Sequence, residues 1–210
     1  MTVRSPWTPS LFIQFKERIV AKIAIVYHSG YGHTARQAEA VKNGAASISG
    51  VHAALYPVAE IDEAKWAELG EADAIIFGAP TYMGSLSAPF KDFMDKSSKV
   101  WFSQGWKDKI AAGFTNSASQ SGDKLNSLIQ LMIFAQQHSM VWVGVGLMPG
   151  NNSSQGSVND LNRLGSFSGA MAQSNADQGA EAMLESDLKT ASHLGARVAE
   201  KTLQFVKGRA

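Results

Sequence analysis

Residues 29–34 form a short polar loop whose side chains and backbone could bind a phosphate group. The stretch reads Ser-Gly-Tyr-Gly-His-Thr, follows the apolar run 22–27 and stands directly before a helical pattern. Ser29, Tyr31 and Thr34 offer hydroxyls, the glycines let backbone N–H groups turn inward, and the start of a helix adds partial positive charge. These features favour a phosphate site over a plain strand-to-helix turn.

Three kinds of phosphate ligand can be compared with this loop. A P-loop for a nucleoside triphosphate needs a lysine before its Ser or Thr, and no lysine precedes Thr34. The dinucleotide fingerprint is matched formally by Gly30, Gly32 and Ala35, but the second strand is followed by no carboxylate before Glu60. A phosphate monoester needs only hydroxyls and backbone N–H groups, so it fits the loop best.

Two further polar segments follow other apolar runs of the chain. Residues 78–84, Gly-Ala-Pro-Thr-Tyr-Met-Gly, come after the run 74–77, and residues 115–124 come after the run 110–114. The carboxyl ends of parallel strands meet at one edge of a sheet, where the ligands of such folds bind. The N–H groups of the second segment, together with Tyr82, could border a flat ring. We therefore expect the three loops to form one crevice.

The elements that must position these loops are visible as an alternation of patterns. Five short apolar runs predict strands, at 22–27, 52–56, 74–77, 110–114 and 140–145. Runs this short and this apolar are typical of a parallel sheet that is covered on both faces. Helical patterns lie between and after them, around 35–48, 89–95, 125–132 and 188–199. The alternation predicts an α/β doubly wound sheet, and a long loop rich in Gly, Asn and Ser, at 146–180, interrupts it.

The composition excludes several classes of chemistry. The 210 residues are 45% hydrophobic, carry a formal net charge of +1 and contain no cysteine. Disulfides and thiol catalysis are therefore excluded, and the composition fits a reducing cytoplasm. The chain shows no basic stripe with interleaved aromatics, which argues against nucleic acid as a partner, and no apolar run of the ~18 residues that a membrane helix needs. The histidines show no metal-ligand pattern.

Residues 1–21 are expected to form an extension that precedes a single domain at 22–210. A flexible leader, or a start codon assigned too early, is favoured over an export signal. The apolar run 11–13 is too short for a signal peptide and is followed by three charged residues at 16–18. An arm that packs on a neighbouring subunit is a further alternative.

Three segments together resemble the signature loops of the flavodoxin-like NAD(P)H:quinone oxidoreductases, often called the tryptophan-repressor-binding protein (WrbA) family. They are residues 29–34, 78–84 and 137–140, and the resemblance covers about residues 22–207 in the same order. It implies a flavodoxin-like fold with a five-stranded parallel sheet in the order 2-1-3-4-5 and helices on both faces. It also implies FMN as cofactor, two-electron transfer from NAD(P)H to quinones or similar acceptors in a ping-pong order, and a homotetramer or dimer.

The resemblance also implies which residues contact FMN. The phosphate would be held by the first loop, at Ser29, Tyr31, Gly32, His33 and Thr34. The isoalloxazine ring would be lined by the second loop, at Pro80, Thr81, Tyr82, Met83 and Gly84. The ribityl chain and the ring would be flanked by the third loop, at Thr115, Asn116, Ser117, Ser119 and Gly122.

Catalysis is expected to involve His138, Tyr82 and Trp101. The resemblance puts His138 over the ring, where a histidine could donate a proton to a reduced quinone. The alternative for His138 is a residue placed at a helix C-terminus because the dipole favours it. The resemblance puts Trp101 near the active site, whereas a tryptophan is more often part of the core or of a subunit contact.

Two positions depart from the family pattern. Tyr82 stands where the family usually has arginine, and the third loop keeps only Gly122 where the family has several glycines. We expect these changes to affect the choice of donor and acceptor more than the binding of FMN. Three other functions remain open: an electron-carrying flavodoxin, which the net charge of +1 disfavours because such carriers are acidic, a flavin reductase that releases reduced FMN, and a non-enzymatic interaction protein.

Overall fold

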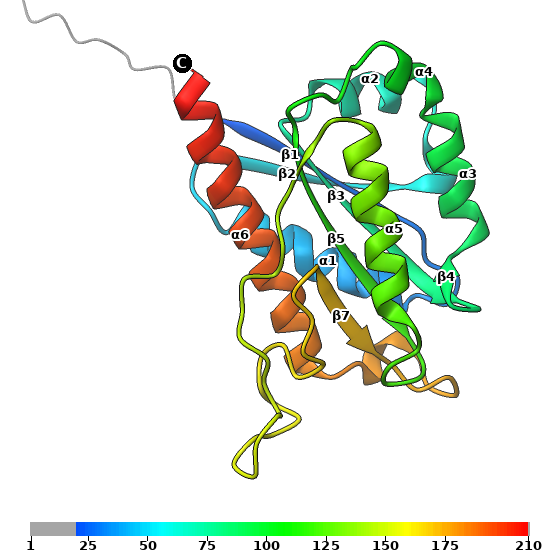
Figure 1. Ribbon diagram of the computed structural model, residues 1–210, viewed down its shortest axis with the longest axis vertical. Coiled ribbons are helices and arrows are strands. Elements are labelled where there is room, and N and C mark those ends of the chain that lie inside the picture. The colour runs from blue at the N-terminus through cyan, green and yellow to red at the C-terminus, as the bar shows by residue number, and fades with distance from the viewer. Residues whose placement is uncertain (1–19, 210) are drawn as a thin grey trace, which may run out of the picture.

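A parallel sheet forms the centre of the molecule. The computed structural model describes residues 20–209, so most of the predicted extension 1–21 lies outside the described residues. The main strands follow the spatial order β2-β1-β3-β5-β6 (Figure 1), and their bounds are β1 Ala21–Tyr27, β2 Val51–Pro57, β3 Ala74–Tyr82, β5 Ile110–Ser117 and β6 Val141–Trp142. This order confirms the predicted flavodoxin-like, doubly wound sheet.

The fifth position of the sheet is shared by two short strands. β6 pairs with the amino end of β5, where Ile110 lies opposite Val141, while β7 (Ala170–Gln173) pairs with its carboxyl end, from Phe114 onwards. The sequence had predicted one strand at 140–145. Instead residues 143–169 leave the sheet after two paired residues, and Figure 1 shows this segment in yellow, extending well beyond the other loops.

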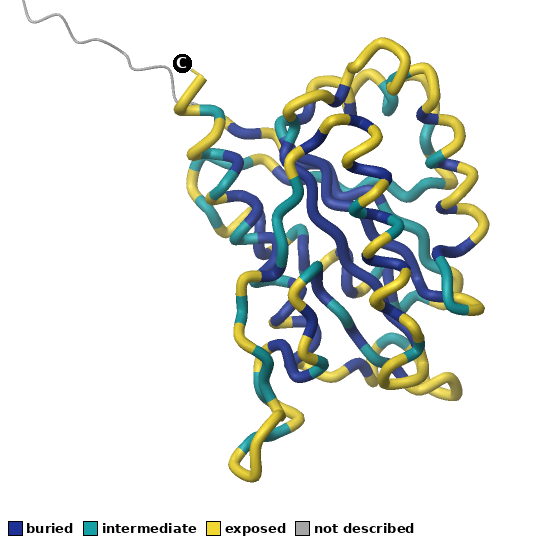
Figure 2. Tube along the Cα trace, viewed as in Figure 1, coloured by how far each residue is buried: buried dark blue, intermediate teal, exposed yellow. Residues whose placement is uncertain are grey.

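Helices cover both faces of the sheet. One face is covered by α1 (His33–Ala46) and α6 (Glu185–Arg209), and the other by α2 (Glu63–Glu71), α3 (Ala88–Lys96), α4 (Ser98–Phe102) and α5 (Lys124–Gln137). Successive side chains of a strand point to opposite faces, so Ile25 packs with α1 and α6 whereas Val26 joins the aromatic cluster around Trp106. Figure 2 shows the buried strands in dark blue between helices whose outer sides are exposed.

Two glycines let α1 and α6 approach closely. A Cβ atom on Gly44 would lie 1.8 Å from the Ser192 carbonyl oxygen, and one on Gly195 would lie 1.9 Å from the Val41 carbonyl oxygen. No side chain larger than hydrogen fits at either contact. The long terminal helix is thereby held flat against α1, whose N-terminus faces the carboxyl edge of the sheet.

Two strands extend further than their apolar runs predicted. β3 continues to Tyr82 and β5 to Ser117, so Thr81, Tyr82 and residues 115–117 lie in strands and not in loops. The ladder continues because backbone pairing does not depend on side-chain polarity, and Pro80 still lies opposite Asn116. The remaining short elements are β4 (Ser85–Leu86), which pairs with the end of β3, and the 3-10 turns η1 (Val58–Glu60) and η2 (Ala180–Ala182).

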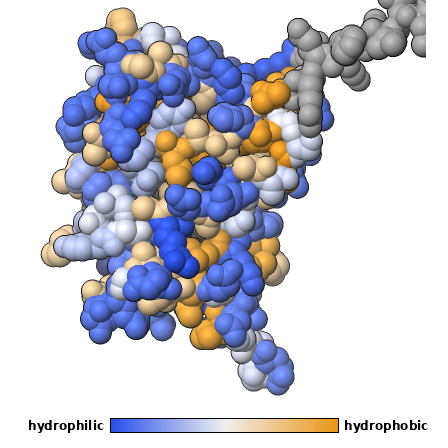
Figure 3. Space-filling model, turned by 180° about the vertical axis from the view of Figure 1, so that it is seen from behind, coloured by the Kyte–Doolittle hydropathy of each residue, from blue (hydrophilic) through white to orange (hydrophobic). Residues whose placement is uncertain are grey.

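The reverse side of the molecule is mainly hydrophilic (Figure 3), with hydrophobic side chains gathered in smaller patches between polar ones. Within residues 20–209, no helix has both the length and the apolarity that crossing a membrane requires.

Candidate functional site

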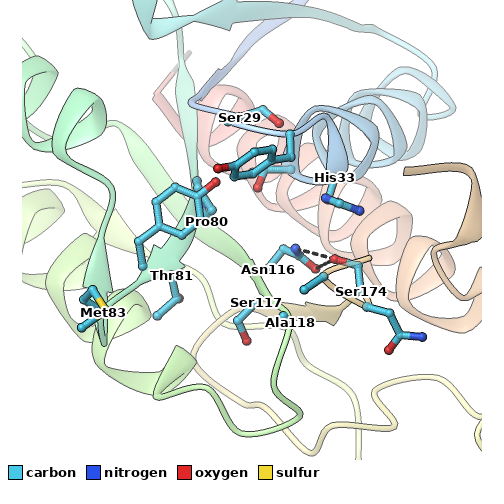
Figure 4. A pocket seen from close by; sticks show the side chains of 15 residues that line it. Ser29, His33, Pro80, Thr81, Met83, Asn116, Ser117, Ala118 and Ser174 are labelled. Atoms are coloured by element: carbon cyan, nitrogen blue, oxygen red, sulfur yellow. Dashed lines mark hydrogen bonds between the residues drawn. The ribbon is translucent and has the colours of Figure 1, made fainter. Parts of the chain in front are cut away.

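A cavity of ≈ 530 Å³ lies at the carboxyl edge of the sheet (Figure 4). Its walls come from the loop after β1, the ends of β3 and β5, and the segment after β7. The lining residues are Ser29, Gly30, Tyr31, His33, Thr34, Pro80, Thr81, Tyr82, Met83, Asn116, Ser117, Ala118, Ser174, Asn175 and Ala176. The three loops singled out in the sequence therefore do meet at one crevice.

Not every predicted site residue lines this cavity. Its lining does not include Gly32, Gly84, Thr115, Ser119 or Gly122, and His138 and Trp101 line a different cavity. Conversely, Gly30, Ala118 and residues 174–176 line the cavity although the sequence analysis did not select them.

The first loop presents an uncapped helix start to the cavity. Gly32 is the N-cap of α1, with φ 91°, and no side chain of the described residues caps this end of the helix by a hydrogen bond. The Gly32 N–H donates to Ser29 Oγ at 3.1 Å, and the first helical bond runs from the Arg36 N–H to the Gly32 carbonyl. The N–H groups of the intervening first turn have no acceptor within the helix, which makes this end suited to an anion.

The electrostatics of the first loop come from the backbone. Among the described residues, no lysine or arginine lines the cavity, so an anion there would be held by N–H groups and hydroxyls. His33, the first residue of α1, has its Nε2 atom 2.9 Å from the Gln178 carbonyl oxygen, so its ring ties the loop to the segment after β7.

A directed chain of hydroxyls lies beneath the second and third walls. Thr115 donates its proton to the Ala79 carbonyl at 2.7 Å, so it can only accept from Thr81, 2.8 Å away. Thr81 has then used its own proton and must accept from Ser127, at 2.7 Å. All three side chains are buried. These hydrogen-bonded hydroxyls join the ends of β3 and β5 to α5 and fix the position of Thr81 in the cavity wall.

Tyr82 closes the cavity against the first loop. A Cβ atom on Gly30 would lie 2.5 Å from the Tyr82 hydroxyl, so the absence of a side chain at Gly30 lets the ring pack there. The Tyr31 and Tyr82 rings meet edge to face at 6.4 Å between centroids. Partial burial raises the pKa of Tyr82, so its hydroxyl keeps its proton at neutral pH. The catalytic role of Tyr82 stays a prediction.

The turn after Tyr82 explains the exposure of the next residue. Met83 and Gly84 both have positive φ, 49° and 76°, as the two central residues of a type I′ hairpin turn do. This turn joins β3 to β4 and leaves the Met83 side chain fully exposed at the rim of the cavity.

The segment after β7 forms the fourth wall. The Asn116 amide donates to Ser174 Oγ at 2.8 Å, that hydroxyl lies 3.2 Å from Asn116 Oδ1, and the Ser174 N–H donates to the Ser117 carbonyl. Sequence reasoning missed this wall because a four-residue strand, Ala-Met-Ala-Gln, has too little apolar pattern to stand out. The available signal was the length of the loop 146–180 and its content of Gly, Asn and Ser, because long loops in compact domains are often functional.

His138 and Trp101 do not lie at this cavity. They line a second cavity of ≈ 380 Å³, between α3, α4 and α5. The reason is topological: α5 begins at the carboxyl edge of the sheet and runs back to the opposite edge, so a residue at its C-terminus lies far along the strands from its start. Within one chain, His138 therefore lies at a different cavity from the three loops, and its place over the FMN ring stays a prediction.

The hydrogen bonds of His138 define its tautomer. Ser97 Oγ donates to the Met94 carbonyl at 2.7 Å, so His138 Nε2, 2.9 Å from Ser97 Oγ, must carry a proton and donate it. Nδ1 is buried without a partner among the described residues, and the ring packs against Trp106 and Phe134. Burial lowers the pKa of His138 from 6.5 to about 4, so the ring is neutral near pH 7.

This burial predicts a loss of stability in mild acid. The folded pKa of about 4 lies below the unfolded value of 6.5, so the unfolded chain binds the proton first and stability falls as pH drops below 6.5. The His138 contribution to the free energy of unfolding should fall by roughly 2 kcal/mol from about pH 7.5 to about pH 5. Urea unfolding of the wild type and His138→Gln at both values measures it. An equal pH dependence in the two proteins would contradict the assignment.

Three comparisons relate the chain to known proteins. A family model described as NADPH-dependent FMN reductase matches residues 52–153. The chain is 46% identical to flavodoxin FldP of Pseudomonas aeruginosa, over 86% of this chain and 96% of that protein. It is 31% identical to an NAD(P)H dehydrogenase (quinone) of Aromatoleum aromaticum, over 90% of this chain and 99% of that protein. A crystal structure of a flavodoxin, WrbA-like protein from Agrobacterium tumefaciens has a TM-score of 0.70 and 44% identity, covering 88% of this chain and 98% of that one.

Proposed function

The chain belongs to the flavodoxin-like NAD(P)H:quinone oxidoreductase family of the WrbA type, and from this membership we propose that it binds FMN and transfers two electrons from NAD(P)H to quinones or similar acceptors. The observation that carries the proposal is the cavity at the carboxyl edge of the sheet, where the uncapped start of α1 faces the polar ends of β3 and β5.

The residues of the cavity fit FMN. A volume of ≈ 530 Å³ lies within the range of small-molecule and cofactor sites. The first turn of α1, with the hydroxyls of Ser29 and Thr34, would hold the phosphate, and no basic side chain is needed there. Pro80 and Tyr82 would border the ring from one side, and Asn116 and Ser117 from the other. FMN would supply the redox chemistry, while the protein binds and orients it.

The rim of the cavity favours small-molecule donors and acceptors. Tyr31 is 80% exposed and Met83 is fully exposed, so the cavity faces solvent at the rim to which these two side chains belong. We propose that NAD(P)H and the quinone use this one opening in turn, which would give ping-pong kinetics. Nucleic acid has no part in the proposal.

An electron-carrying flavodoxin is the second candidate, because the 46% identical relative from Pseudomonas aeruginosa is named a flavodoxin. Such a carrier would bind the same FMN in the same cavity and pass electrons to a protein. The two functions therefore differ in whether NAD(P)H reduces the bound flavin directly.

A visible spectrum of the protein with FMN tests the proposal. We expect bound flavin to bleach when NADPH or NADH is added without oxygen, and a quinone to restore its colour. Bound flavin that neither donor bleaches would favour the carrier. A protein that takes up no FMN would contradict both functions and favour a non-enzymatic role, and release of the reduced flavin would indicate an FMN reductase.

A homo-oligomer would allow the two cavities to belong to one site. His138 and Trp101 keep their predicted catalytic role only if a neighbouring copy of the chain brings the second cavity to the first. Trp101 is 46% exposed and Ile133 is 50% exposed beside it, which gives that region an apolar surface. We therefore propose a homo-oligomer, a tetramer or a dimer, and a monomer in sedimentation velocity would exclude any catalytic part for His138.

The proposal also includes the extent of the domain and its location in the cell. Residues 22–210 would act as one FMN-binding domain, and the cysteine-free sequence favours the reducing cytoplasm as its location. The acceptor would be a small molecule.

A further inference from the structure

Lys124 is a fully buried lysine at the start of α5. Lys124 has 0% exposure, and its Nζ atom donates to three oxygens at the end of β5 and in the loop that follows it. The acceptors are Ser117 Oγ at 2.7 Å, the Ser119 carbonyl at 2.9 Å and the Gln120 carbonyl at 2.7 Å. The three protons of the ammonium group are thus used on three neutral groups that together define the shape of the third loop.

In the part of the chain that the structure describes, the positive charge of Lys124 forms no ion pair with a carboxylate. None of the ion pairs found among residues 20–209 involves it, and the carboxylate that acts on it from a distance, Asp187, is already bound by Arg163 through two hydrogen bonds. Burial lowers the pKa of Lys124 to about 8, so the group is still mainly protonated near pH 7. A buried cation without an anion is costly, and a protein rarely keeps one for packing alone.

The ammonium group lies directly behind the wall of the cavity. Ser117 lines the cavity, and its Oγ accepts from Lys124 while donating to the Ser119 carbonyl at 2.9 Å. The loop closes tightly here, because a Cβ atom on Gly122 would lie 2.2 Å from Ser117 Oγ. Within residues 20–209 no lysine or arginine lines the cavity itself, and Lys124 places a full positive charge one hydroxyl away from it.

We propose that Lys124 is a positioning residue that shapes the third loop and, through its buried charge, raises the reduction potential of the flavin bound in the cavity. This inference rests on the proposed FMN function. Reduction adds two electrons and one proton to the flavin ring and so gives it one more negative charge. A fixed cation at the wall stabilises that reduced form more than the oxidised one, because Coulomb energies decay slowly inside a protein.

The test compares the midpoint potential of bound FMN in three variants. Lys124→Met removes both the charge and the hydrogen bonds, and Lys124→Gln keeps a donor but no charge. Lys109→Met is the matched control, because Lys109 is a half-buried lysine that donates to the Gly70 and Ala72 carbonyls just before β5, at the opposite edge of the sheet. FMN affinity and thermal stability are recorded for each protein.

We expect both neutral Lys124 variants to lower the equilibrium constant of two-electron reduction by about tenfold, which corresponds to a midpoint lower by about 30 mV. The Lys109→Met midpoint should equal that of the wild type. A merely structural role for Lys124 would alter stability and leave the potential unchanged.

The outcomes separate this inference from the proposed function. Wild-type protein that binds no FMN would overturn both, whereas bound FMN with an unchanged midpoint in the Lys124 variants would overturn the inference alone. An equal shift in the Lys109 control would also overturn it. If neither neutral variant holds FMN, Lys124→Arg decides: recovered binding supports the need for charge, and failure to recover contradicts it.

Discussion

Replacing Gly32 with valine should weaken FMN binding by more than about tenfold, because the residue sits where the phosphate must approach the backbone. Gly32 is the N-cap of α1 and has φ 91°, a conformation that is costly for a β-branched residue. To relieve that strain, the loop must turn, and the N–H groups of the first helical turn then no longer face the cavity. The methyl groups would also occupy space next to the phosphate.

Fluorescence titration of FMN measures this loss, with Gly70→Val as the control. Gly70 lies in α2, a Cβ atom there meets nothing within 4 Å, and the site is remote from the cavity. The control should bind FMN as the wild type does. An unchanged FMN affinity in Gly32→Val would show that the phosphate is held elsewhere, even if the protein proves to be a flavoprotein.

Much of the fold could be predicted from local patterns. Buried parallel strands are continuous apolar runs, and the runs at 22–27, 74–77 and 110–114 all lie in central strands. The prediction of a single fifth strand at 140–145 failed because a long segment interrupts this strand. β6 keeps only Val141–Trp142 in register, and β7 takes the same position in the sheet after residue 169. No local pattern predicts that two segments separated by the 27 residues 143–169 both pair with the same strand, β5.

Part of the candidate site could likewise be predicted from the sequence, and part of it could not. The first three walls follow strands directly in sequence, so strand order alone brings them together. The wall at Ser174 depends on the interrupted fifth strand, and the position of His138 depends on the direction of α5 and on the number of copies in the assembly. Lys124 is the last residue of the polar segment 115–124 that the sequence singled out. Its importance comes from its complete burial, which is not expected of a charged residue at the start of a helix.

Breaking the buried ion pair between Arg163 and Asp187 should cost about 3–5 kcal/mol of unfolding free energy. Arg163 belongs to the segment that leaves the sheet, and its Nε and Nη2 atoms donate to Asp187 of α6 at 2.8 and 2.7 Å. Both side chains are almost fully buried, and Asp187 also accepts from the Gln173 N–H at the end of β7. In Arg163→Met, the carboxylate would stay buried and keep only the Gln173 N–H of these three hydrogen bonds.

Urea unfolding measures this cost, and two further proteins show that burial causes it. Lys96→Met breaks the exposed pair with Asp92, which has the same 2.7 Å separation, and should cost below about 1 kcal/mol. The double variant Arg163→Met, Asp187→Asn should recover most of the loss, because the neutral amide still accepts from Gln173. Since Gln173 directly precedes Ser174 of the fourth wall, Arg163→Met should also weaken FMN binding, and the double variant should restore it. A cost of Arg163→Met no larger than that of Lys96→Met would mean that the extended segment does not anchor this wall.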